Sequence, residues 1–318
     1  MNPLIWDDVL SNQMHFESEQ VHVLTALYGA GVGNSSDIDE HLLIAKSIEL
    51  MKASTLILDD FLDKSETRNG LPSVFSARGA EQTVLIAEIM RSTALIEFCK
   101  AANKVKHEDF VKAVCIFEEA YKTICFGQLE DIKLEASPFS FDAPTEDDYF
   151  KMIHNTSGVF IQLPLLIGAF FSGYSRSELK TFAEYGIKLG LAYQVRDDII
   201  DIVADPNITG KPVAGDIRYG KKRLPILRLR NVCSEEERKC LFEFINGKKP
   251  LPEKHVQEII DIIIKYRIIP SCMTTVTQLC NEALSAIKNI PDQRMHDQLI
   301  DIAMLLTDFD CIPENVRI

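Results

Sequence analysis

The stretch Leu56–Asp63 reads LILDDFLD, and the later stretch Tyr193–Asp201 reads YQVRDDIID. Both place aspartates at positions i, i+1 and i+4 among apolar residues. On a helix, the first and last of these carboxylates stand one turn apart on the same face. Because like charges at this spacing repel each other, and more strongly among apolar neighbours, the pattern indicates that a bound cation compensates them.

The two clusters predict a magnesium site. Mg²⁺ prefers hard oxygen ligands, keeps several waters and is commonly completed by substrate phosphate oxygens, so the clusters also imply a phosphorylated substrate. We expect six aspartates to be the metal-binding residues: Asp59, Asp60, Asp63, Asp197, Asp198 and Asp201.

Two other interpretations of the clusters are weaker. Solvated acidic faces would show the same residues, but two DDxxD motifs arise by chance in fewer than roughly one in a hundred such chains. A di-iron carboxylate bundle needs two ExxH pairs, whereas the sequence offers a single pair, Glu19 with His22.

Composition limits the class of protein. The chain has 318 residues, 46% of them hydrophobic and 25% charged, so it can bury a sizeable core and is neither disordered nor fibrous. Its net charge of -13 repels nucleic acid, and we expect no nucleic-acid partner.

The eight cysteines form no CxxC pair, which indicates reduced thiols. The sequence lacks a basic and apolar leader and any apolar run near the roughly 18 residues of a membrane span, so we expect a cytoplasmic protein without stable membrane insertion.

The pattern of apolar residues predicts an all-α fold. Long windows carry apolar residues at i, i+3, i+4 and i+7, and glycine is sparse. The breaks between these windows, such as 69–72, 137–144 and 205–220, are short and similar in composition. We therefore predict one large helical bundle that forms a single domain over residues 1–318.

Basic residues follow both clusters. Arg68 lies five residues after Asp63, and the segment after the second cluster holds Lys211 and the run Lys221–Arg223. Such cations suit a site in which aspartates hold metals while Lys and Arg contact diphosphate oxygens. Taken alone, the run Lys221–Arg223 would indicate an exposed basic loop. Its position after a metal cluster favours a role in binding.

Between Ala45 and Leu229 the chain resembles the trans-prenyl diphosphate synthase family of isoprenoid synthases. Besides the aspartate motifs, the resemblance rests on Ile48–Leu50, Arg68, Gly70, Pro72, Gly127, Gln128, Asp131, Thr156, Gly168, Ala169, Gln194, Gly210, Lys211, Asp216, Gly220, Lys221 and Pro225. It implies a helical bundle around a deep apolar cavity, a homodimer, and three Mg²⁺ ions that ionise an allylic prenyl diphosphate substrate.

The resemblance also implies roles for single residues. Asp59, Asp63 and Asp197 would be the principal metal ligands and catalytic residues. Three cations would hold the departing diphosphate: Arg68, Lys211 and Lys221. Breaking an allylic C–O bond gives a delocalised cation and an anionic leaving group, so metals and fixed cations at the leaving group lower the barrier. Apolar walls then shield the cation from water.

Side chains before the first cluster indicate the depth of the cavity. Ser54 and Thr55 are small, so we expect Met51 to form the floor and leave room for about 15 to 20 carbons. Four more residues are expected in the substrate pocket: Gln128, Thr156, Phe160 and Gln194.

The chain departs from the family pattern where the acceptor, isopentenyl diphosphate, binds. The basic segment before the first motif is replaced by Phe16–Val21, a second arginine by Asn69, a histidine by Phe75 and a lysine by Asn155. Charge-assisted contacts contribute about 1.5–3 kcal/mol each, so the loss of three weakens acceptor binding by orders of magnitude.

These departures favour a class I terpene synthase, in which the ionised substrate cyclises or eliminates. The alternative is a prenyl diphosphate synthase that condenses isopentenyl diphosphate with an allylic diphosphate. A further alternative is a non-catalytic partner subunit that binds prenyl diphosphates, and the two intact aspartate motifs disfavour it.

Overall fold

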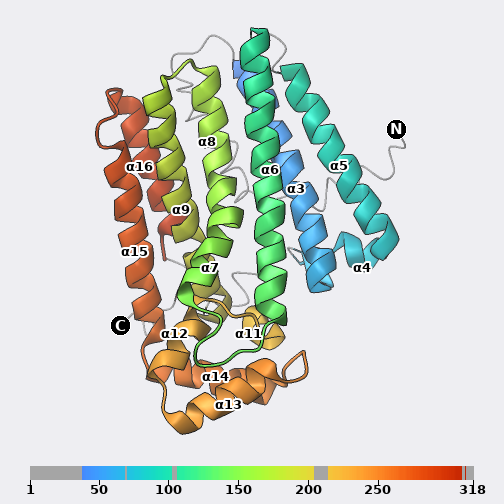
Figure 1. The fold of residues 1–318 in the computed structure, drawn as a ribbon, viewed down its shortest axis with the longest axis vertical. Helices are drawn as coiled ribbons and strands as arrows, with labels where there is room; N and C mark the ends of the chain where they lie inside the picture. Colours follow the sequence, from blue (N-terminus) through green and yellow to red (C-terminus); the bar gives the residue numbers. More distant parts are fainter. Residues whose placement is uncertain (1–37, 69, 102–105, 204–213, 310–311, 313–318) are drawn as a thin grey trace. The chain divides into compact units, whose positions relative to one another are not determined.

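The computed structural model describes residues 38–68, 70–101, 106–203, 214–309 and 312 (Figure 1). The elements in chain order are α3 (Ile38–Asp63), β1 (Thr67–Arg68), β2 (Leu71–Pro72), α4 (Val74–Arg78), α5 (Ala80–Ala101), α6 (His107–Ala136), α7 (Glu146–Ile153), the π-helix η3 (His154–Gly158), α8 (Val159–Phe171), α9 (Arg176–Val203), α11 (Gly215–Tyr219), α12 (Leu224–Val232), α13 (Glu235–Asn246), α14 (Glu253–Lys265), α15 (Ile268–Ile287) and α16 (Gln293–Thr307). Apart from the two short strands, the regular structure in these residues is helical, which confirms the all-α prediction.

The described residues form two compact units. The first comprises those within 1–121, 160–183 and 290–302, and the second those within 122–159, 184–289 and 303–318. The single domain over residues 1–318 stays a prediction.

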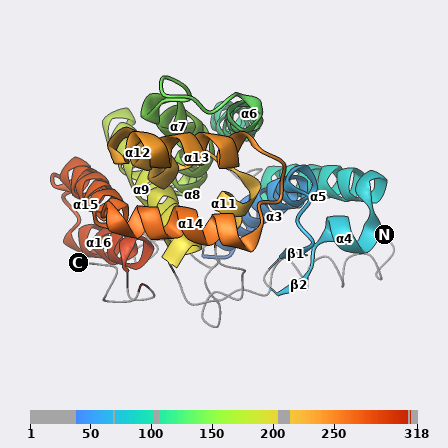
Figure 2. The same ribbon diagram turned by 90° about the horizontal axis from the view of Figure 1, so that it is seen from below.

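In the first unit, α3 packs along α5, as Figures 1 and 2 show. Buried apolar residues recur every three or four positions on both helices: Ile44, Ile48 and Met51 on α3, and Met90, Ala94 and Phe98 on α5. Phe98 also stacks on Phe117 of α6, with ring centroids 4.5 Å apart. The predicted helical period therefore becomes a buried interface.

A short hairpin follows α3. β1 and β2 pair antiparallel, with Thr67 opposite Pro72. Gly70 in the turn has a φ of +76°, a conformation that glycine adopts without steric cost. The hairpin leads the chain back, so that the Arg68 guanidinium reaches the last turns of α3.

In the second unit, one apolar core joins parts of α7, α9, α12, α14 and α15. Capping boxes begin two helices, with Thr145 and Asp148 at α7 and Ser234 and Glu237 at α13. Buried residues on α14 are spaced by three or four positions: Val256, Ile259 and Ile263. This core carries the end of α9 that holds the second aspartate cluster.

Within the described residues, one helical stretch, Glu146–Phe171, is long and apolar enough to cross a membrane. Of its most apolar window, 56% is buried inside the protein. Such burial is typical of a core helix.

Candidate active site

The first aspartate cluster lies in the last two turns of α3. The side chain of Asp59 is 33% exposed, whereas that of Asp60 is 1% exposed. Asp63 is half-buried at the end of the helix. The two carboxylates one turn apart are therefore reached by solvent, and the middle one is covered.

Arg68 compensates the charge of this cluster. Its Nε lies 3.0 and 3.1 Å from the two oxygens of Asp60, and its Nη2 lies 2.6 Å from Asp60 Oδ1 and 3.3 Å from Asp59 Oδ2. Burial opposes the charge of Arg68, but the hydrogen bonds and charges of Asp60 and Asp59 raise its pKa above the ordinary value. The structure thus brings together three of the predicted site residues, and the predicted contact of Arg68 with diphosphate stays a prediction.

The second cluster lies near the end of α9, and its three aspartates have different surroundings. Asp197 is exposed. Asp198 is 2% exposed and accepts hydrogen bonds from the Tyr149 hydroxyl, at 2.6 Å, and from Gln194 Nε2, at 2.9 Å. Asp201 accepts the backbone N–H groups of Gly215 and Asp216, at 3.2 and 3.0 Å. The middle aspartate is again the covered one.

The buried position of Asp198 changes its acidity. Burial raises the pKa of Asp198 to about 7, Arg223 opposes the rise, and Asp216 adds to it. Burial and the charge of Asp198 also raise the pKa of Tyr149 well above its ordinary value, so the phenol stays a hydrogen-bond donor.

The three consecutive basic residues after α11 have three different environments. Lys221 Nζ lies 3.7 Å from Glu135 Oε1 and 3.9 Å from Asp216 Oδ1. Lys222 is 5% exposed, and its Nζ donates to the backbone carbonyls of Glu135 and Ser137 near the end of α6. The third, Arg223, has 13% of its side chain exposed. Since none of the three side chains extends into solvent, the interpretation of this run as an exposed basic loop is wrong.

Arg223 links α6 to the segment that follows α11. Its Nη1 and Nη2 donate to the two oxygens of Asp131, at 2.6 and 3.0 Å, and its Nε lies 3.5 Å from Asp216 Oδ2. Burial opposes the ionisation of Asp131, but Arg223 holds its pKa below the ordinary value. Arg223 therefore supplies positive charge between two carboxylates of the second unit.

The π-helix η3 contains two predicted positions. Thr156 Oγ1 donates to the Met152 carbonyl at 3.1 Å. Asn155, which replaces the family lysine, donates through Nδ2 to Glu130 Oε2 at 2.8 Å, and Lys151 Nζ lies 2.5 Å from the other oxygen of Glu130. An amide thus occupies the position where the family pattern has a lysine.

Most of the remaining predicted residues lie in one or the other of the two units. In the first unit, Met51 and Ser54 are fully buried and Thr55 nearly so, while Phe160 is half-buried. The hydroxyls of Ser54 and Thr55 donate to backbone carbonyls of α3. In the second unit, Gln128 is half-buried. Lys211 lies outside the described residues, and the deep apolar cavity stays a prediction.

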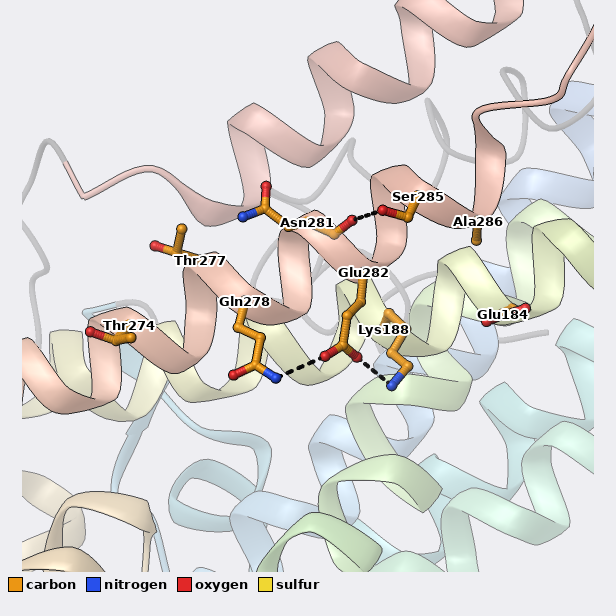
Figure 3. Close-up of a pocket in the computed structure, with 9 residues that line it drawn as sticks. All are labelled: Glu184, Lys188, Thr274, Thr277, Gln278, Asn281, Glu282, Ser285 and Ala286. Atoms are coloured by element: carbon orange, nitrogen blue, oxygen red, sulfur yellow. Dashed lines mark hydrogen bonds and ion pairs between the residues drawn. The ribbon is translucent and has the colours of Figure 1, made fainter.

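A polar groove of about 870 Å³ lies between α9 and α15 in the second unit (Figure 3). Glu282 stands at its centre, where it accepts Gln278 Nε2 at 3.0 Å and pairs with Lys188 Nζ at 2.6 Å. No residue of either aspartate cluster lines it.

The donor atoms at both clusters fit magnesium. No group of three or more His, Cys, Asp or Glu residues is placed to enclose a metal within the part of the chain that the structure describes. Mg²⁺ does not require such a cage, because it is usually held by one or two carboxylates plus water and phosphate oxygens. Asp59 and Asp63 on α3 and Asp197 on α9 offer solvent-reached carboxylate oxygens of this kind.

Some residues around the clusters were not identified as partners from the sequence. Tyr149 carried no signal of its own, and Arg223 stood in the basic run without a predicted partner, because their carboxylate partners lie 49 and 92 residues away in the chain. Asp131 stood in the family pattern, and its partner remained unknown.

Comparison with known proteins gives a family match. The family model described as polyprenyl synthetase matches residues 19–263. A short chain isoprenyl diphosphate synthase of Methanocaldococcus jannaschii is 30% identical over 227 residues, which are 71% of this chain and 67% of that protein. A geranylgeranyl diphosphate synthase of Sulfolobus acidocaldarius is 30% identical over 222 residues, which are 70% of this chain and 66% of that protein.

Solved structures have the same fold. The polyprenyl synthase of Caulobacter crescentus, complexed with calcium and isoprenyl diphosphate, gives a TM-score of 0.86 at 20% identity and covers 97% of this chain and 90% of its own. The geranylgeranyl pyrophosphate synthetase of Pyrococcus horikoshii gives 0.82 at 23% identity, with 98% and 92% covered. The named relatives are prenyl diphosphate synthases, so they favour the elongation alternative over the cyclisation that the sequence departures favoured.

Proposed function

Since this chain belongs to the polyprenyl synthetase family, we propose that it is a Mg²⁺-dependent prenyl diphosphate synthase, which condenses isopentenyl diphosphate with an allylic prenyl diphosphate. The observation that carries the proposal is the family match together with two intact aspartate clusters, each with solvent-reached carboxylates and a fixed cation nearby. Those cations are Arg68, which pairs with Asp60 and Asp59, and Lys221, which lies 3.9 Å from Asp216, the residue whose backbone N–H bonds Asp201.

The side chains fit the first step of this reaction, the departure of diphosphate. Mg²⁺ bound by Asp59, Asp63 and Asp197 would neutralise charge on the leaving group, and the family resemblance implies three such ions. Arg68, Lys211 and Lys221 would hold the diphosphate oxygens. Because Arg68 is already held by Asp60, it needs little reorganisation to stabilise the developing charge.

We propose a short-chain substrate of about 15 to 20 carbons. Small Ser54 and Thr55 and the larger Met51 occupy successive turns of α3 before the cluster, and all three are buried. One relative is named as a short chain enzyme and another as a geranylgeranyl diphosphate synthase, and both names support a short-chain product.

Cyclisation or elimination remains a second candidate because of two observations at the acceptor positions. Asn155 bonds Glu130 and brings no positive charge. Phe75, which replaces a family histidine, packs edge-on against Phe61 with ring centroids 5.7 Å apart. Both changes remove groups that would recognise a second diphosphate.

We also propose that the protein is a homodimer through α6. This helix exposes three large apolar side chains near its carboxyl-terminal end: Phe126 (56%), Leu129 (59%) and Ile132 (41%). Their spacing of three residues puts them on one side of the helix. Exposed apolar residues that gather in this way mark interaction surfaces.

The test is product analysis by mass spectrometry. The protein is incubated with Mg²⁺ and allylic diphosphates of increasing length, with and without isopentenyl diphosphate. A longer prenyl diphosphate formed only with isopentenyl diphosphate supports the proposal. A hydrocarbon or alcohol formed without it supports the second candidate. If no substrate is consumed, both fail and a non-catalytic binding subunit is favoured.

A further inference from the structure

Two side chains of the continuous helical segment α7–η3 connect through hydrogen bonds to Asp198 of the second aspartate cluster. Tyr149 lies on α7, and Ser157 lies in η3 directly after it. The Tyr149 hydroxyl donates to one oxygen of Asp198, while Ser157 Oγ donates to Gln194 Oε1 and Gln194 Nε2 donates to the other oxygen of Asp198. Gln194 and Asp198 stand one turn apart on α9, so the four residues close a ring between two helical segments.

The π turn explains how Tyr149 and Ser157 face the same helix. In a regular α-helix each residue rotates by about 100°, so residues eight apart point about 80° away from each other. In η3 the Val159 N–H bonds the His154 carbonyl five residues back, which accommodates one extra residue within the turn. Eight residues that include the π turn then rotate the chain as far as seven residues of a regular α-helix do, which is about 20° short of two full turns. Both side chains consequently point toward α9.

Close contacts at two glycines hold the π turn in place. A Cβ added at Gly190 of α9 would lie 2.6 Å from Gly158 Cα. One added at Gly127 of α6 would lie 2.6 Å from Thr156 Cγ2. Two helices can approach η3 this closely only because glycine occupies both positions. The ring of hydrogen bonds therefore lies where α6 and α9 pack closely against η3.

We propose that Tyr149 and Ser157 are positioning residues, which fix the rotation of α9 through Asp198 so that Asp197 presents its carboxylate to the metal. Asp198 itself is a positioning residue, because both of its oxygens already accept hydrogen bonds and 2% of the residue is exposed. This inference rests on the proposed function, since it concerns the same magnesium and diphosphate site.

The experiment measures binding of inorganic pyrophosphate by isothermal titration calorimetry across a series of Mg²⁺ concentrations. Removal of a group that orients a metal ligand commonly weakens metal affinity 10- to 100-fold, so Tyr149→Phe should raise the half-saturating Mg²⁺ concentration by at least about tenfold. Ser157→Ala should raise it less, because it acts through one more hydrogen bond. Tyr185→Phe is the control, since it removes a hydroxyl from another fully buried tyrosine of the same unit, and it should leave binding unchanged.

Substitutions of the aspartates separate positioning from ligation. Asp198→Asn keeps one oxygen for Gln194 and gains an amide that can donate to the Tyr149 oxygen. This variant should therefore bind pyrophosphate in the presence of Mg²⁺ much more tightly than Asp198→Ala. Asp197→Asn should lose Mg²⁺-dependent binding. Equal losses in Asp198→Asn and Asp197→Asn would overturn the positioning role. This comparison decides the question even if Tyr149→Phe does not fold.

The wild-type protein separates this inference from the proposed function. If the wild type shows no Mg²⁺-dependent pyrophosphate binding, the proposed function fails and this inference falls with it. If the wild type binds and Tyr149→Phe binds equally tightly, the proposed function stands and the positioning role is overturned.

Discussion

At the scale of single residues, the aspartates within each cluster differ in their surroundings, whereas those at equivalent positions of the two clusters are alike. Asp60 and Asp198 are the second members of their clusters, and both are buried and hydrogen-bonded. Asp59 and Asp197, the first members, are reached by solvent. The DDxxD pattern therefore combines accessible carboxylates with a covered one that ties the helix to its neighbours.

The accessible aspartates should be essential for turnover and dispensable for folding. We expect Asp59→Ala or Asp197→Ala to lower kcat by more than about a hundredfold, because each removes a charge that would hold the metal ions. Circular dichroism and thermal unfolding should match the wild type, since neither side chain is buried. Wild-type rates in either variant would contradict the metal-binding prediction.

The ion pair between Arg223 and Asp131 should be important for stability. Both side chains are 13% exposed, and breaking a buried pair by removing one partner typically costs about 3–5 kcal/mol. We expect Arg223→Ala to lower the free energy of unfolding by about this amount in urea titrations. The double variant Asp131→Arg with Arg223→Asp should recover part of the loss, and no recovery would show that the pair is not the cause.

Lys249 should make the free energy of unfolding depend on pH in the alkaline range. Burial, with a contribution from Lys222, lowers its pKa from 10.5 to about 8. Between these values the unfolded chain binds the proton and the folded protein does not, so stability rises with pH across this window. Urea titrations below and within the window should show this rise in the wild type and in Lys248→Met, an exposed neighbour, and a smaller rise in Lys249→Met. An equal rise in both variants would contradict the assignment to Lys249.

At the scale of elements, close packing of α9 on η3 has a measurable consequence. Gly→Ala at an exposed helix position normally stabilises by up to about 1 kcal/mol. At Gly190 the added methyl would meet the backbone of Ser157 and Gly158, so we expect Gly190→Ala to destabilise the protein by about 1–3 kcal/mol in urea titrations. Lys180→Ala, at an exposed position of the same helix, is the control. Unchanged stability of Gly190→Ala would show that η3 yields to the methyl group.

At the scale of the whole molecule, the exposed apolar residues of α6 predict self-association. Phe126→Glu places a charge within the proposed contact, so we expect analytical ultracentrifugation to show a dimer for the wild type and a monomer for the variant. Glu119→Gln, a polar change elsewhere on α6, should remain dimeric. A monomeric wild type at micromolar concentration would refute the proposed dimer.

The sequence by itself determined the helical class and the two aspartate clusters. Both follow from local spacing: apolar residues at the helical period predict helices such as α14, and carboxylates at i and i+4 predict a cation site whatever the rest of the chain does. The same local reasoning placed Arg68 beside Asp63 in the sequence, and the hairpin indeed returns it to α3.

Only the tertiary structure decided which of these groups are covered, and by what. Tyr149, Arg223 and Lys222 find their partners across 49 to 92 residues, and the π turn at η3 arises where α6 and α9 approach through glycines. Such contacts depend on how helices pack in three dimensions, because the energy of a buried hydrogen bond or ion pair comes from desolvated neighbours and not from spacing along the chain.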